Sequence, residues 1–179
     1  MKIINHKTAI LIVLGLSLTA CASAPVPPPV WDNHASEKEA SEYAPYATTG
    51  TGIVTGQAFL TQKGGGVVVA AGHEVILDPV TPTSIEWWQK AGKLYALKET
   101  THPSTNFQKA RKTVIADGSG KFTFNNLPAG RYFVRTILTW EVPFHGIQGG
   151  VLGDIVEVQN EQTSNVILNH YAPDYHERH

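Results

Sequence analysis

The chain has 179 residues, a length that suits one domain, because domains commonly contain roughly 100 to 200 residues. Hydrophobic residues make up 42% of the sequence, and 16 glycines and 11 prolines are spread along it. This mixture favours short strands joined by tight turns over long helices. The formal charge is −1, and no basic run or basic stripe with interleaved aromatic residues occurs. Composition therefore predicts one all-β domain, and it excludes nucleic acid as a partner.

The first twenty residues have the three parts of a secretory signal peptide. Lys2 and Lys7 form a basic start, residues 9–18 are apolar, and small residues follow. A membrane-spanning helix needs about 20 apolar residues, and this run has roughly half of that number. We therefore expect residues 1–20 to direct export and then to be removed. Loss of the two lysines changes the formal charge from −1 to −3.

The signal ends in Leu18-Thr19-Ala20-Cys21, which resembles a bacterial lipobox. The resemblance implies cleavage before Cys21 and a covalent lipid on it, consisting of diacylglycerol and an N-acyl chain such as palmitate, with no other cofactor. Several acyl chains, at about 0.8 kcal/mol per buried methylene, hold a protein on a membrane where one chain would let it leave. The alternative is ordinary cleavage, which would leave an unpaired thiol in an exported protein. The residue directly after Cys21 is Ala22 and not Asp. The resemblance to enteric lipoproteins then implies the outer membrane, with the domain facing the periplasm or the cell surface.

Residues 21–50 are predicted to comprise the lipidated cysteine and a flexible linker. Four prolines lie between residues 25 and 29, and a polar stretch without a periodic apolar face follows. Proline runs favour an extended polyproline II conformation of roughly 3.1 Å per residue, so the segment would hold the domain away from the bilayer. Its aromatic residues, Trp31, Tyr43 and Tyr46, either dock on the domain or lie at the bilayer interface.

From residue 51 onward, short apolar runs alternate with Gly, Pro and Asn, which predicts about seven strands. We expect one helical turn over residues 83–89 and strands over residues 53–60, 73–77, 94–98, 109–116, 121–125, 131–142, 151–158 and 163–169. Strands at this spacing without a long helix predict a single two-sheet β-sandwich over residues 51–169. A His-rich tail, residues 170–179, follows the domain.

Three stretches resemble the carboxypeptidase regulatory-like domain, a transthyretin-like β-sandwich related to the Cna-type B repeats of bacterial surface proteins. They are residues 52–58, residues 71–81, and residues 116–124 followed by residues 127–132. In the third stretch Asp117 precedes two glycines that can adopt positive φ, and its carboxylate can accept hydrogen bonds from nearby amides. Phe122 and Phe124 then share one face. The resemblance implies a domain that binds, spaces or stabilises more often than it catalyses.

The sequence favours a protein that is not an enzyme. No Gly-x-Ser-x-Gly elbow occurs, and the serines lie mostly in the linker and in turns. Lys63-Gly64-Gly65-Gly66 is better explained as a hairpin loop than as a phosphate-binding loop, because the lysine precedes the glycines and no helix pattern follows.

Two groups of residues are candidates for binding. His170, His176 and His179 could ligate a metal such as zinc, copper or nickel, or they could be part of a polar, frayed end. The aromatic group could stack on a sugar or anchor a protein, or its rings could simply cover the ends of the sandwich. Its members are Trp87, Trp88, Trp140, Phe144 and His145.

The sequence therefore predicts a non-enzymatic envelope lipoprotein, attached to the membrane through its lipid, whose sandwich contacts another envelope protein or gives structural support. One alternative is a module that binds carbohydrate or peptidoglycan. Another is a docking lipoprotein like that of type VI secretion, which pairs a lipobox with a transthyretin-like fold.

Overall fold

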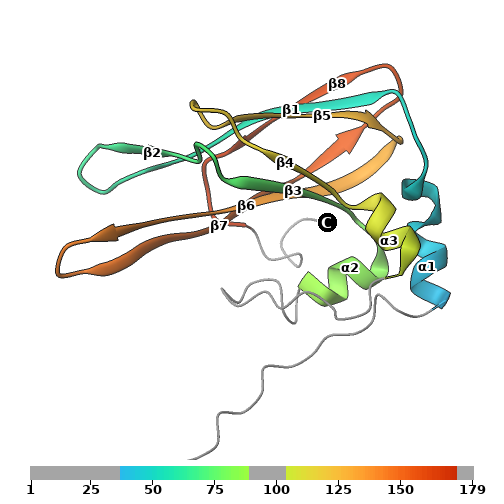
Figure 1. Cartoon of the computed structure of the whole chain (residues 1–179), viewed down its shortest axis with the longest axis horizontal. Helices are drawn as coiled ribbons and strands as arrows, with labels where there is room; N and C mark the ends of the chain where they lie inside the picture. The colour runs from blue at the N-terminus through green and yellow to red at the C-terminus, as the bar shows by residue number, and fades with distance from the viewer. Residues whose placement is uncertain (1–36, 89–103, 173–179) are drawn as a thin grey trace, which may run out of the picture.

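The computed structural model describes residues 37–88 and 104–172, and these form a two-sheet β-sandwich with short helices gathered at one end (Figure 1). The helical elements are α1 (Glu37–Tyr43), the 3-10 turn η2 (Ala44–Ala47), α2 (Pro82–Trp87) and α3 (Thr105–Ala110). The strands are β1 (Gly52–Thr61), β2 (Val67–Val69), β3 (Glu74–Pro79), β4 (Lys112–Ile115), β5 (Lys121–Leu127), β6 (Gly130–Val142), β7 (Gly146–Val158) and β8 (Thr163–Leu168). The predicted all-β sandwich is confirmed.

Each sheet has four strands. In the first sheet β1 pairs antiparallel with β2 and β5, and β8 runs parallel to β1. The second sheet has the order β4-β3-β6-β7, and all of its pairings are antiparallel. The longest pairing joins β6 to β7 and extends to Val142 and Gly146 beside the turn. The β1–β2 and β6–β7 hairpins project at the end of the sandwich opposite α1 and α3 (Figure 1).

The core lies between the two sheets, and side-chain alternation along the strands builds it. Phe122 and Phe124 of β5 point inward with the exposed Thr123 between them, as predicted, and their rings make an edge contact at 6.0 Å. Leu127, Leu138 and other aliphatic side chains from both sheets are fully buried beside them. Truncating one such leucine typically costs about 2 to 5 kcal/mol.

The predicted turn before β5 has the expected hydrogen bonds. One carboxylate oxygen of Asp117 accepts from the Ser119 amide, the Ser119 hydroxyl and the Lys121 amide, at 2.8, 2.8 and 2.9 Å. These bonds hold the pKa of Asp117 below its usual value. Of the two glycines in the turn only Gly120 has positive φ, at 75°.

The folded part of the chain begins earlier than the expected boundary at residue 51. Tyr43 and Tyr46, two of the aromatic residues expected to dock or to lie at the bilayer, pack on the domain. Tyr43 is fully buried against Phe107 at 5.1 Å, and Tyr46 makes an edge contact with Tyr132 at 5.3 Å. The Glu42 carboxylate accepts from the Thr83 amide at 3.0 Å. Residues 37–50 therefore belong to the folded unit, while Trp31 lies outside the described residues.

The strand expected over residues 109–116 begins later, because residues 105–110 form α3. The Ser104 side chain caps this helix by accepting a hydrogen bond from the Phe107 amide at 3.1 Å. Phe107 and Ala110 form the buried face of the helix. The strand expected over residues 94–98 lies outside the described residues. The three-residue strand β2 was not expected, because its Val67–Val69 run has no alternation. The helical turn expected over residues 83–89 is α2, residues 82–87.

A buried ionic cluster ties α3 to the second sheet. Asp78 of β3 accepts two hydrogen bonds from Arg111, at 2.6 and 2.9 Å, and one from Arg135 of β6 at 3.2 Å. Burial by itself would raise the pKa of Asp78, but the two guanidinium groups outweigh it and hold the pKa below its usual value. Arg135 is only 2% exposed, so the Asp78 carboxylate offsets part of the cost of burying this charge.

Candidate functional site

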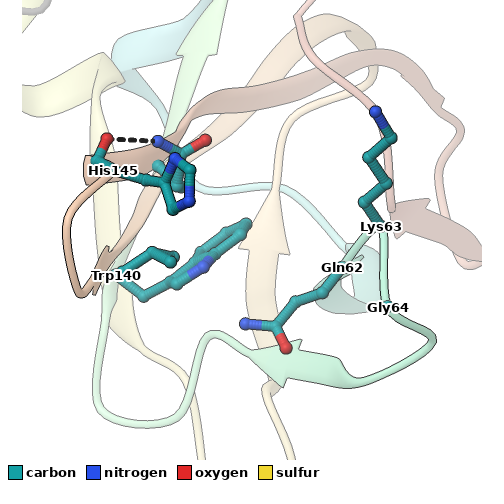
Figure 2. A pocket seen from close by; sticks show the side chains of 7 residues that line it. Gln62, Lys63, Gly64, Trp140 and His145 are labelled. Carbon is teal, nitrogen blue, oxygen red and sulfur yellow. Dashed lines mark hydrogen bonds between the residues drawn. The ribbon is translucent and has the colours of Figure 1, made fainter.

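The clearest candidate site is a pocket of about 510 Å³ between the β1–β2 and β6–β7 hairpins, called the Trp140 pocket below (Figure 2). The first hairpin contributes residues of its loop, and the second contributes residues from both strands and the turn. The lining residues are Gln62, Lys63, Gly64, Trp140, Val142, His145 and Gln148. This volume falls within the range of about 300 to 1,000 Å³ that is typical of small-molecule sites.

Trp140 lies partly buried at the centre of the pocket and packs against the main core. Its indole Nε1 is shielded from solvent and has no hydrogen-bond partner among the described residues. The ring lies against Gly149, where a Cβ would come within 3.0 Å of Cζ3 and within 2.1 Å of the Leu138 carbonyl oxygen. A glycine at φ 95° therefore makes room for the indole ring.

Two amide side chains give the pocket polar groups. The side chain of Gln62 points toward the indole ring of Trp140 (Figure 2), and it makes no hydrogen bond to the described part of the chain. The Gln148 amide nitrogen donates to the carbonyl oxygens of His145 and Ile147, at 3.1 and 3.3 Å, so its own oxygen remains an acceptor for a ligand. Sequence analysis missed both glutamines, because only the fold brings two hairpins some 80 positions apart into contact.

The turn of the β6–β7 hairpin places two of the predicted binding residues differently. His145 lines the pocket, whereas Phe144 stands at the tip and is fully exposed. The His145 amide donates to the Val142 carbonyl at 2.9 Å, and Phe144 has φ 65° directly after Pro143. Proline followed by a residue of positive φ is typical of a type II turn, and the position after the proline favours glycine. A phenylalanine there is both strained and solvated, which marks it as a candidate contact residue.

Trp88 does not belong to this site. It is 1% exposed and packs against Phe133 with ring centroids 4.4 Å apart. Phe133 and Trp140 are an odd number of residues apart on β6, so their side chains point to opposite faces of that strand. Trp88 packs on the Phe133 face and therefore lies on the side away from Trp140. Trp88 is therefore a packing residue, in agreement with the alternative that this ring covers the sandwich. The Trp87 side chain lies outside the described residues.

The predicted C-terminal metal site is not assembled within the described part of the chain. His170 lies 3.9 Å from the Asp154 carboxylate, and its Nδ1 is 3.2 Å from the side-chain oxygen of Asn169. No group of three or more His, Cys, Asp or Glu side chains able to hold a metal occurs among residues 37–88 and 104–172. His176 and His179 lie outside these ranges, as does Cys21.

No helix in the described ranges is long and apolar enough to cross a membrane.

Comparisons with known proteins agree with the fold. No protein-family model and no curated protein matches the sequence. Among solved structures, a candidate carbohydrate-binding protein of Pseudomonas aeruginosa has a TM-score of 0.61 and 24% identity, over 73% of this chain and 95% of that one. BcpA, the major pilin subunit of Bacillus cereus, has a TM-score of 0.40 and 16% identity, over 68% of this chain and 30% of that one. GBS52, a minor pilin of Streptococcus agalactiae, has a TM-score of 0.36 and 14% identity, over 68% and 44%.

The Pseudomonas aeruginosa structure shares the fold described above, and the class of this domain is a two-sheet β-sandwich.

Proposed function

We propose that this chain is a non-enzymatic, lipid-anchored protein of the bacterial envelope whose β-sandwich binds a saccharide in the Trp140 pocket. The observation that carries the ligand assignment is the indole ring of Trp140, which lines an open pocket together with the side-chain amides of Gln62 and Gln148.

The chemistry of the pocket suits a sugar. An indole ring can pack against the apolar face of a pyranose, while the Gln62 and Gln148 amides can pair with its hydroxyls. The open backbone at Gly64, where no atom lies within 4 Å of a Cβ position, leaves room for a ring to approach the loop. Carbohydrate is also the ligand class in the description of the Pseudomonas aeruginosa neighbour, although the likeness to that protein shows the fold alone.

The direct test is binding to a panel of neutral and acidic oligosaccharides, followed by titration calorimetry with Trp140→Ala. We expect Trp140→Ala to weaken binding at least tenfold, because the variant loses the aromatic face on which the sugar would pack. Tyr171→Ala is the control, since it removes an exposed aromatic residue that does not line the pocket. If no saccharide binds, or if both variants bind like the wild type, the proposed function is wrong.

A protein partner is the second candidate, and the exposed, strained Phe144 favours it. Crosslinking in intact cells followed by pull-down would capture such a partner with the wild type and lose it with Phe144→Gly. Co-purification of a secretion-complex membrane subunit in the same experiment would support the type VI-like alternative. Recovery of the same proteins with both forms would exclude the hairpin tip as the contact.

A further inference from the structure

The Trp140 pocket has a charge asymmetry that narrows the class of ligand. Among the described residues that line the pocket, Lys63 is the one with an ammonium group, and His145 adds an imidazole ring. No carboxylate lines the pocket within the described part of the chain. Glu141 follows Trp140 directly in β6, so strand alternation directs its carboxylate to the opposite face.

The charged group that lacks a partner in this pocket is a donor. The ammonium group of Lys63 donates hydrogen bonds and cannot accept them. Among the described residues Lys63 makes no ion pair. In the β1–β2 loop, Gly64 and Gly65 have open space where side chains would be, so nothing blocks access beside the lysine. A ligand that completes this pocket must therefore bring acceptors, and a negatively charged one fits best.

We infer that the pocket selects acidic saccharides, in which a sugar carboxylate pairs with Lys63 and the ring lies against Trp140. This inference rests on the proposed function and specifies its ligand. Hydrogen bonds between charged partners are roughly twice as strong as neutral ones, so the carboxylate should contribute strongly to the preference. The apolar face of the ring and the remaining hydroxyls would use the indole and the two glutamine amides.

The test compares tetrasaccharides of hexuronic acid with their methyl esters, which have the same sugar and length but no charge. Titration calorimetry of the full chain in detergent should give about tenfold tighter binding for the acids, the ratio expected for one charged hydrogen bond. Lys63→Gln should remove most of that ratio, because it lowers the affinity for the acids much more than the affinity for the esters. Lys109→Gln is the matched control, because Lys109 is an exposed lysine on α3, at the other end of the sandwich (Figure 1).

Trp140→Phe adds an independent check, because it keeps an aromatic ring but offers the sugar a smaller face. We expect weaker binding of acids and esters alike. Added salt should weaken binding of the acids and spare that of the esters, because exposed charges are screened. Equal affinity for acids and esters would overturn the acidic preference while leaving the saccharide site in place. Loss of the preference in Lys109→Gln would overturn the role of Lys63, and no binding of any sugar would overturn the proposed function itself.

Discussion

Replacing Asp78 by Asn should destabilise the sandwich more than any exposed charge substitution. The change keeps the size of the side chain but removes the negative charge that two guanidinium groups contact. Arg111 is 16% exposed in its side chain and can regain water, whereas Arg135 is 2% exposed and cannot. Removing one partner of a buried ion pair typically costs about 3 to 5 kcal/mol, and the access of Arg111 to water places our expectation near 3 kcal/mol.

Urea unfolding followed by tryptophan fluorescence measures this effect. With an m value of about 1.5 kcal/mol/M, a loss of about 3 kcal/mol lowers the midpoint by about 2 M. Glu141→Gln is the matched control, because it neutralises an exposed carboxylate and should change the free energy of unfolding by less than about 0.5 kcal/mol. If the midpoint of Asp78→Asn coincides with that of the wild type, the buried carboxylate does not compensate Arg135 and the reasoning fails.

Four further outcomes are expected, three from the structure and the last from the lipobox in the sequence. The pKa of Asp78 is lower in the folded than in the unfolded state, where it is about 3.9, so its contribution to stability is complete above that value and is lost as pH falls through the folded pKa. Wild-type stability should therefore fall more steeply below about pH 4 than that of Asp78→Asn, and parallel curves would contradict this. Tyr46→Ala should lower the free energy of unfolding by about 1 to 3 kcal/mol in the same urea assay, because its ring packs on Tyr132; no change would place residues 37–50 outside the cooperative unit. Phe144→Gly should leave the unfolding midpoint unchanged or slightly raised, since glycine suits positive φ and the exposed ring buries nothing; a loss above about 1 kcal/mol would show a packing role. Cys21→Ala should abolish the lipid mass and membrane fractionation seen with the wild type, and soluble, unmodified protein in both cases would refute the lipoprotein assignment.

Local sequence patterns were sufficient to predict the β-sandwich and its most specific turn. Alternation at Phe122 and Phe124 depends only on the two-residue repeat of a strand, and the bonds of Asp117 reach no further than Lys121. The sequence also identified Trp140 and His145 as candidates from residue type. Their assignment to one pocket required the packed structure.

Tertiary packing decided the features that join distant parts of the chain. The pairing of Asp78 with Arg135, the burial of Trp88 and the docking of Tyr43 each depend on which surface lies opposite, and a local pattern does not contain that information. Residues 105–110 form a helix because a cap at Ser104 and burial of Phe107 outweigh the strand-like run that follows. The Trp140 pocket likewise exists only because two hairpins project side by side, which brings Lys63 and Gln62 to an indole ring nearly 80 residues away.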